Sequence, residues 1–271
     1  MISITDDELK RLSDYVREHY GVNLINKRTL IEGRLGLQLS ARGFDSYGEY
    51  LNFVINSPDK TEISNMLNRL TTNHTYFMRE SDHFTFFQDT VLPWIDGELH
   101  DKDLRLWSAG CSTGQEAYAL SISILEYTGT HISSVWDSKM LASDISNEAL
   151  RVASNGIYEN EDLSSVPENL RSKYFIPVDE KSSRVIPALR NNIAFKNINL
   201  MDPIDAKKPF HTIFCRNVMI YFDNPTKMKL IDNFYDAIIP GGYFFIGHSE
   251  SLATLDHRFT YVRPSIYRKE V

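Results

Sequence analysis

The feature of the sequence that most restricts its fold is an alternation of short apolar segments with helical segments, which begins near residue 104. The apolar segments have the length of buried strands and span residues 104–109, 140–143, 193–198, 211–215 and 243–247. Segments with helical periodicity separate several of them and span residues 117–127, 147–153 and 225–238. This alternation predicts an α/β fold with a parallel, Rossmann-like sheet covered by helices on both faces. The last apolar stretch, residues 259–268, is expected to supply one or two edge strands.

The first seventy or so residues show helical patterns and no strand signal. Thr5 and Glu8 have the spacing of a capping box at the start of a first helix. A second helix is expected over about residues 28–41, and the Ser-Pro pair at residues 57–58 is expected to open a fourth. We therefore predict an N-terminal all-helical domain over residues 1–72.

The remaining residues, 73–271, are expected to form the sheet domain. Between about residues 157 and 192 the alternation gives way to short mixed segments, which predicts a small inserted β subdomain. A turn is expected at residues 240–242, where Pro-Gly-Gly precedes the strand at 243–247. The chain has 271 residues, 42% of them hydrophobic, which is enough for a sizeable core in one large domain or two smaller ones.

Composition restricts the class of partner and the compartment. The formal net charge of −7 disfavours a nucleic-acid partner, because phosphates would be repelled at long range. Cys111 and Cys215 lie far apart and lack metal-ligand spacing, so we predict no metal site and expect reduced thiols in a cytoplasmic protein. No apolar run is long enough for direct membrane insertion. Nothing in the sequence requires an assembly larger than a monomer.

A glycine-containing turn follows the predicted strand at residues 104–109. In the segment W-S-A-G-C-S-T-G-Q-E, Gly110 and Gly114 remove side chains where a ligand would approach the backbone closely. The turn lies where an open parallel sheet binds nucleotide-like ligands, although an ordinary strand–helix turn can also contain two glycines. Asp144 ends the next strand, where a carboxylate can accept the hydrogen bonds of both ribose hydroxyls or simply cap a helix.

Three further polar segments are candidates for a site. Asn199 and Leu200 follow a predicted strand and are able to flank an adenine ring, but such residues also form turns. Arg216 and Asn217 end an apolar strand in the segment F-C-R-N-V-M-I-Y-F, with Tyr221 beyond them. The junction of the two predicted domains carries T-T-N-H-T-Y-F-M-R. A cleft would form at that junction, and the alternative is a polar linker.

Together these segments resemble the chemotaxis receptor methyltransferase family, CheR, over nearly the whole chain. The resemblance rests on N-x-T-x-F-x-R at the junction, the W-S-A-G-C-S-T-G-Q-E turn, the A-S-D strand end, the N-L pair and C-R-N-V-M-I-Y-F. It implies a methyltransferase that uses S-adenosylmethionine to esterify receptor glutamates and releases S-adenosylhomocysteine. The alternatives are a methyltransferase for another acceptor and a non-catalytic S-adenosylmethionine sensor, which the presence of Arg79 and Tyr221 disfavours.

The resemblance also implies roles for individual residues. Those implied to contact the cofactor are Asn73, Thr75, Arg79, Glu116, Asp144, Asn199, Leu200, Arg216 and Asn217. Within this set, Asp144 would hold the ribose of the cofactor and Glu116 would bind the amino group of the cofactor. Asn199 and Leu200 would flank the adenine. Arg79 would orient the acceptor carboxylate with help from Tyr221, so these two are the predicted catalytic residues.

Recognition of the cytoplasmic domain of a chemoreceptor is assigned to the helical domain. Its predicted receptor-binding residues, with a single acid among them, are Lys27, Arg28, Arg34 and Arg42. Methylation regions of chemoreceptors are acidic helices, so these cations would steer the encounter, although such charges often form only a solvated face. Some family members also dock the C-terminal peptide of the receptor through a glycine-rich loop in the inserted subdomain. Residues 177–184 contain no glycine, so we expect no such pentapeptide tether.

Overall fold

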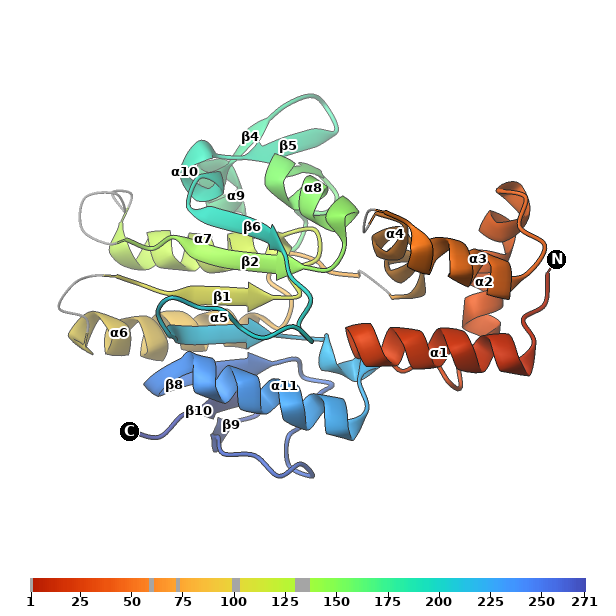
Figure 1. Ribbon diagram of the computed structural model, residues 1–271. Helices are drawn as coiled ribbons and strands as arrows, with labels where there is room; N and C mark the ends of the chain where they lie inside the picture. Colours follow the sequence, from red (N-terminus) through yellow and green to blue (C-terminus); the bar gives the residue numbers. More distant parts are fainter. Residues whose placement is uncertain (1, 59–60, 72–73, 99–102, 130–136) are drawn as a thin grey trace.

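The computed structural model describes residues 2–58, 61–71, 74–98, 103–129 and 137–271, and a seven-stranded sheet lies at its centre (Figure 1). The strands are β1 (Leu106–Ala109), β2 (Met140–Asp144), β6 (Ile193–Asn197), β7 (Phe210–Cys215), β8 (Ile238–Ile246), β9 (Thr260–Arg263) and β10 (Ile266–Arg268). Their order is β6-β2-β1-β7-β8-β10-β9. The first five are parallel, whereas β10 is antiparallel to both of its neighbours. The predicted α/β sheet is confirmed.

The strand order reverses between β1 and β7. β2 and β6 extend the sheet on one side of β1, whereas β7 and β8 extend it on the other. In an open sheet, ligands bind at such a reversal, beyond the carboxyl ends of the strands. Figure 1 shows that this edge faces the four N-terminal helices, which are α1 (Asp6–Tyr20), α2 (Arg28–Ala41), α3 (Tyr47–Asn56) and α4 (Thr61–Leu70).

Helices cover both faces of the sheet. They are α5 (Ser81–Phe86), the π-helical segment η1 (Phe87–Val91), α6 (Leu92–Glu98), α7 (Gln115–Thr128), α8 (Asn147–Asn155) and α11 (Asn224–Ala237). Side chains alternate between the two faces along β8. Phe244 and Ile246 pack in a core with α11, and Tyr243 and Phe245 pack in a second core with α5, α6 and α7. The sheet therefore separates two cores, as expected for a sheet buried on both faces.

The N-terminal helices belong to the same core as α11. The first of them begins at the predicted capping box, in which Thr5 and Glu8 bond reciprocally, and ends at Gly21 with φ 75°. Leu12 and Val16 on its buried face are part of the core cluster that includes Phe244. The helical region thus shares a continuous apolar core with the sheet domain.

Polar contacts also join the helical region to the carboxyl edge of the sheet. Val22 pairs with Phe222 in an isolated antiparallel bridge, just after the 3-10 turn η3 (Met219–Tyr221). The N–H of Asn23 donates to Tyr221 O at 2.8 Å, and the Ser64 hydroxyl donates to Ile145 O at 3.2 Å. These contacts fix the space between the helices and the strand ends.

A small second sheet confirms the predicted inserted subdomain. It has the antiparallel order β3-β5-β4, with β3 (Ile157–Glu159), β4 (Phe175–Pro177) and β5 (Ser182–Val185). Two short helices accompany it, α9 (Glu168–Tyr174) and α10 (Pro187–Arg190). Among the residues that the structure describes, no helix has the length and apolar character needed to cross a lipid bilayer.

Two local predictions are wrong. Ser57 ends α3 in an extended conformation, because the following proline disfavours a helical residue before it, and Pro58 is not helical. Residues 240–242 lie inside β8 rather than in a turn. Gly241, with φ 80°, lets the strand bulge while its N–H still donates to Lys269 O, so the ladder continues through the glycines.

The helical stretch from Ser81 to Glu98 is absent from the sequence-based prediction. Phe84, Phe87, Val91 and Ile95 recur at helical spacing and are buried, which is the signal that would have indicated it. The expected domain boundary at residues 72 and 73 lies outside the described residues.

Candidate functional site

The glycine turn after β1 folds back onto the end of β2. Gly110, Ser112 and Gly114 have left-handed backbone conformations, with φ of 85°, 49° and 96°. The N–H groups of Gly110 and Cys111 both donate to Ser143 O at 2.8 Å. The start of α7 is thereby held against the end of β2.

Packing within the protein explains the two glycines. A Cβ on Gly110 would overlap Cγ2 of Val218, and a Cβ on Gly114 would lie 2.8 Å from Cβ of Ala153. Protein atoms therefore exclude side chains at both positions, which is a different reason from the expected close approach of a ligand. The left-handed conformations add a second reason, because they are strained for residues that carry a Cβ.

Replacing Gly110→Ala should destabilise the fold. We expect the free energy of unfolding, measured by urea denaturation, to fall by about 2 kcal/mol or more, because the methyl group adds a clash to an unfavourable φ. Gly33→Ala is the matched control, since a Cβ there meets nothing within 4 Å in the middle of α2, and alanine is the better helix former. Equal unfolding free energies for the two variants would contradict this account.

Asp144 is buried at the end of β2 with both of its oxygens engaged. Oδ2 accepts the N–H of Ser112 at 2.8 Å, and Oδ1 accepts that of Ser146 at 2.9 Å. Burial raises the pKa of Asp144, and the backbone donors oppose that shift. A carboxylate oxygen can accept two hydrogen bonds, so each keeps a lone pair for a ligand hydroxyl. Asp144 can therefore order the glycine turn and bind a vicinal diol simultaneously.

A buried group of charges lies beside it. The Arg216 side chain, only 2% exposed, donates from Nη2 to Glu80 Oε2 at 3.0 Å and from Nη1 to Glu116 Oε2 at 3.1 Å. Arg216 Nε also donates to Glu80 Oε2, at 3.2 Å. The other oxygen of Glu116 accepts the Ser108 hydroxyl at 2.6 Å. One guanidinium thus holds carboxylates from two distant parts of the chain.

The two carboxylates titrate differently. Burial raises the pKa of Glu116, and the Arg216 charge and the Ser108 hydroxyl offset only part of this effect. Burial also acts to raise the pKa of Glu80, but the Arg216 charge and the His248 backbone N–H outweigh it and hold the pKa below its ordinary value. Arg216 faces both carboxylates, and Arg79 Nε lies 4.0 Å from Glu80 Oε1. The group is therefore close to charge balance when both carboxylates are ionised.

Arg79 lies in a strained segment just before α5. Its Nη1 donates to His74 O at 3.0 Å, its guanidinium lies 5.9 Å from the centre of the Tyr76 ring, and its Nε lies 4.0 Å from Glu80 Oε1. Met78 and Glu80 on either side both have φ 57°. The Arg79 side chain remains 28% exposed, so it can reach a substrate as well as its own chain.

The turn after β7 is held by the loop after β8. The N–H of Asn217, whose φ is 60°, donates to Glu250 Oε2 at 2.9 Å, and the Gly247 N–H donates to the same oxygen at 2.6 Å. A Cβ on Gly247 would lie 2.8 Å from Cγ of Asn217. The Asn217 amide nitrogen is 3.4 Å from Glu80 Oε1, so this turn also reaches the charged group.

Many of these groups line one cleft at the carboxyl edge of the sheet, whereas Glu80 and Ser108 are not part of its lining. The predicted cofactor-binding and catalytic residues that line it are Thr75, Arg79, Glu116, Asp144, Asn199, Leu200, Arg216, Asn217 and Tyr221. Asn73 lies outside the described residues. The helical region closes the cleft with Tyr20, Val22 and Leu67. The structure thus brings together side chains that are spread over most of the sequence.

Two of the predicted contacts are already engaged with protein groups. The Asn199 amide donates to His19 O at 2.7 Å and accepts the Met201 N–H at 3.1 Å, which fixes this loop to α1. The Arg216 guanidinium is directed at Glu80, Glu116 and the Arg79 carbonyl. Direct ligand contacts from these two side chains stay predictions.

Glu80 and Ser108 are functional candidates that sequence reasoning missed. A buried arginine requires a carboxylate partner, so Arg216 at the end of an apolar strand was a signal that a second acid lies nearby. Glu80 directly follows the polar segment that ends at Arg79. Ser108 lies within β1 and gave no comparable signal.

The predicted receptor-binding cations lie in and beside α2, away from the cleft lining. Arg28 bonds Asp6 and Ile4 O, and Arg42 pairs with Glu62. Arg34 donates to the carbonyls of Arg69, Leu70 and Thr71, at 3.1, 3.3 and 2.9 Å, so it caps the end of α4. Lys27 is exposed at the start of the helix.

Family models cover both parts of the chain. The model described as "CheR methyltransferase, all-alpha domain" matches residues 7–71. The model described as "CheR methyltransferase, SAM binding domain" matches residues 73–267. The chain belongs to the CheR methyltransferase family. Its fold is that of the CheR all-alpha domain followed by an S-adenosylmethionine-binding methyltransferase domain, as the sequence predicts.

Individual CheR relatives align over almost the whole chain. The "Chemotaxis protein methyltransferase" of Borreliella burgdorferi is 37% identical over 273 residues, which cover 99% of this chain and 96% of that protein. The protein of the same name from Escherichia coli is 33% identical over 271 residues, covering 98% and 92%. "Chemotaxis protein methyltransferase 2" of Pseudomonas aeruginosa is 32% identical over 268 residues, covering 97% and 93%.

Proposed function

We propose that this chain transfers the methyl group of S-adenosylmethionine to glutamate side chains in the cytoplasmic domain of chemoreceptors, forming methyl esters. Membership of the CheR family supports the methyltransferase chemistry. The names of the relatives support a role in chemotaxis. We further infer a monomer that acts in the cytoplasm without a metal ion or a nucleic-acid partner.

The cleft residues fit the cofactor by charge and hydrogen-bonding capacity. Asp144 keeps an acceptor on each oxygen, which suits the two ribose hydroxyls. Glu116, a carboxylate in the cleft lining, suits the amino group of the cofactor. Leu200 and Ile198 supply an apolar wall for the adenine. When bound, S-adenosylmethionine supplies a methyl group on a sulfonium, which is an activated leaving group.

The residues of the chain then need to align an acceptor that is already reactive. A glutamate has an unperturbed pKa of about 4.3 and is ionised at neutral pH, so no strong base is required. Arg79 binds and orients this carboxylate, and Tyr221 assists it. Arg79 and Tyr221 hold the carboxylate oxygen of the acceptor within roughly 3 Å of the methyl carbon. This fixed geometry replaces a random encounter in solution and is the main source of acceleration here.

One observation supports this function best. The groups suited to a cationic nucleoside, Asp144 and Glu116, and the groups suited to a carboxylate, Arg79 and Tyr221, line the same cleft. A sensor that only binds the cofactor has no need of Arg79 and Tyr221. Nothing in the described part of the chain favours the sensor alternative.

The test is incubation with tritium-labelled S-adenosylmethionine and receptor-containing membranes. We expect the receptor to become labelled and to release this label as methanol on treatment with base, because a glutamate methyl ester is base-labile. Receptors with their acceptor glutamates changed to alanine are the control. Label in the soluble fraction only, or label on receptor that resists base, would identify another acceptor.

Encounter with the receptor gives a further prediction. Lys27→Glu should lower kcat/KM for receptor methylation about fivefold at low salt and less at high salt, because steering between exposed charges is screened. Arg34 is a poorer probe, because it caps the end of α4 and its substitution would also lower the stability of the chain. Lys181→Glu in the turn between β4 and β5 is the control, and an equal effect of both changes would contradict steering by the helical region.

We also infer that the inserted subdomain holds no receptor-tail peptide. In the turn between β4 and β5, Asp179 Oδ1 accepts the N–H groups of Lys181 and Ser182 at 2.8 and 2.7 Å, which makes a tight, self-satisfied turn. Micromolar binding of a receptor C-terminal pentapeptide in calorimetry would refute this inference.

A further inference from the structure

The ion pair between Glu80 and Arg216 connects two parts of the site that are far apart in the chain. Arg216 follows β7, whereas Glu80 precedes α5, 136 residues earlier in the chain. Nε and Nη2 of Arg216 both donate to Glu80 Oε2, at 3.2 and 3.0 Å, and Nη2 donates as well to the Arg79 carbonyl. With Nη1 on Glu116, these contacts engage most of the N–H donors of the guanidinium.

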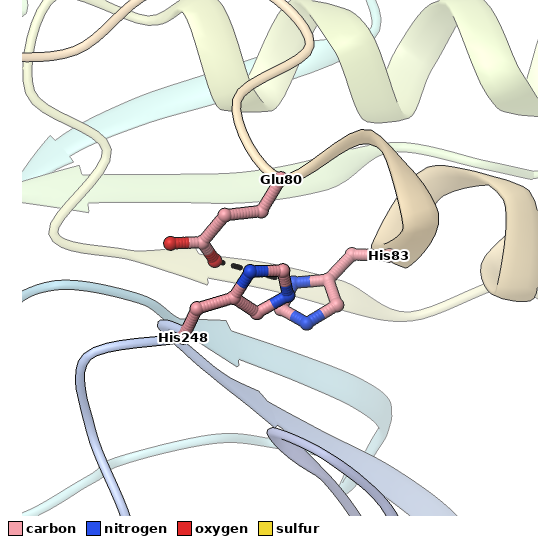
Figure 2. Close-up of side chains that lie close together, drawn as sticks. All are labelled: Glu80, His83 and His248. Atoms are coloured by element: carbon pink, nitrogen blue, oxygen red, sulfur yellow. Dashed lines mark ion pairs between the residues drawn. The ribbon is translucent and has the colours of Figure 1, made fainter.

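The surroundings of Glu80 favour its pairing with arginine over the binding of a metal ion. Figure 2 shows the side chains of Glu80, His83 and His248 converging from the start of α5 and from the loop after β8. His83 Nδ1 lies 3.6 Å from Glu80 Oε2. This is the composition of a cation site, but the same oxygen already accepts two N–H groups from Arg216, whose fixed charge repels a second cation.

The pair also holds a strained backbone. Glu80 has φ 57° and ψ 61° at the N-cap of α5, and its side chain makes no capping hydrogen bond with that helix. A left-handed conformation costs a non-glycine residue about 1–2 kcal/mol, so it persists only where other contacts fix it. Here the Glu80 carboxylate and the Arg79 carbonyl are both held by Arg216.

We propose that Glu80 is a positioning residue for methyl transfer: through Arg216 it sets the placement of Arg79 at the cleft. This inference rests on the proposed function, because Arg79 matters as the group that orients the acceptor. Glu80 itself contacts neither donor nor acceptor. Its charge fixes the Arg216 guanidinium, which in turn holds the backbone carbonyl of Arg79, while Glu116 keeps its hydrogen bond from Ser108.

The experiment compares Glu80→Gln and Glu80→Asp with the wild-type chain. Glu80→Gln keeps the shape but removes the charge, and we expect kcat to fall about tenfold or more. S-adenosylhomocysteine affinity, measured by calorimetry, should change less than about threefold, because Asp144 is untouched. Glu80→Asp keeps the charge and should recover most of kcat. The matched control is Asp82→Asn, which removes a half-exposed carboxylate on the same helix and should leave kcat unchanged.

A second measurement needs no activity. The measurement is a double-mutant cycle of Glu80→Gln and Arg216→Gln, followed by urea unfolding. Arg216→Gln should lower the free energy of unfolding less in the Glu80→Gln background than in the wild-type chain, because its partner charge is already gone. If Glu80→Gln does not fold, Glu80→Asp and Arg216→Lys provide the same comparison, with Arg216→Lys losing kcat because lysine lacks the planar fork.

The outcomes separate this inference from the proposed function. A folded Glu80→Gln variant with wild-type kcat, or additive unfolding effects, would overturn the positioning role. A parallel loss of kcat and of S-adenosylhomocysteine affinity would also overturn it, since Glu80 would then support the cofactor site alone. If the wild-type chain methylates no receptor but the cycle shows coupling, the proposed function fails and the structural link stands.

Discussion

Asp144→Asn is expected to weaken the binding of S-adenosylhomocysteine about a hundredfold, the equivalent of about 2.7 kcal/mol. Both oxygens of Asp144 accept backbone N–H groups, from Ser112 and Ser146. In an asparagine one of these positions becomes an NH₂ group, so a donor faces a donor whichever way the amide is turned. The variant therefore loses acceptors for the ribose and also disturbs the glycine turn. Calorimetric titration measures the change without requiring a methyl acceptor.

Asp256→Asn is the matched control, because it makes the same charge change on an exposed residue outside the cleft lining. It should bind the ligand as the wild-type chain does. The unfolding free energy of each variant is measured in parallel. Wild-type affinity in a folded Asp144→Asn variant would show that this carboxylate serves the turn and not a ligand.

Arg79→Ala is expected to lower kcat for receptor methylation by about a hundredfold to a thousandfold, because the acceptor carboxylate loses the charged group that orients it. The affinity for S-adenosylhomocysteine should fall less than about tenfold, since Asp144 and Glu116 remain in place. Single-turnover assays with receptor-containing membranes measure the first quantity, and calorimetry measures the second. The ratio of the two effects tests whether Arg79 acts on the acceptor or on the cofactor.

Arg151→Ala on the exposed side of α8 controls for the loss of a surface cation. If Arg79→Ala weakens S-adenosylhomocysteine binding as much as it lowers kcat, Arg79 is a cofactor ligand. If neither quantity changes, Arg79 has no part in the reaction and the proposed mechanism is wrong.

The sheet and the candidate site were predictable because their signals are local. Strands such as β7 are short, mostly apolar and buried, and a polar residue at the end of such a strand, like Asp144 or Arg216, must lie at the carboxyl edge of the sheet. The capping box of α1 involves residues three apart, Thr5 and Glu8, so a single pattern predicts it.

The remainder depended on partners that are far apart in the chain. No spacing rule pairs Glu80 with Arg216 or places Arg34 on the carbonyls that end α4. The reason for Gly110 was likewise hidden, because the side chain that excludes a Cβ belongs to Val218. In β8, the Pro-Gly-Gly segment has strong turn propensity, but backbone hydrogen bonds of both glycines with Lys269 keep it in the strand.

The continuous core shared by the N-terminal helices and one face of the sheet restricts how this architecture can be altered by recombination. A fragment that starts after α4 would expose a large apolar surface to water. We expect it to self-associate instead of folding as an isolated catalytic unit. Grafting the helices of a relative onto this sheet therefore requires the buried residues of the shared core to be exchanged with them, not only the exposed charged residues.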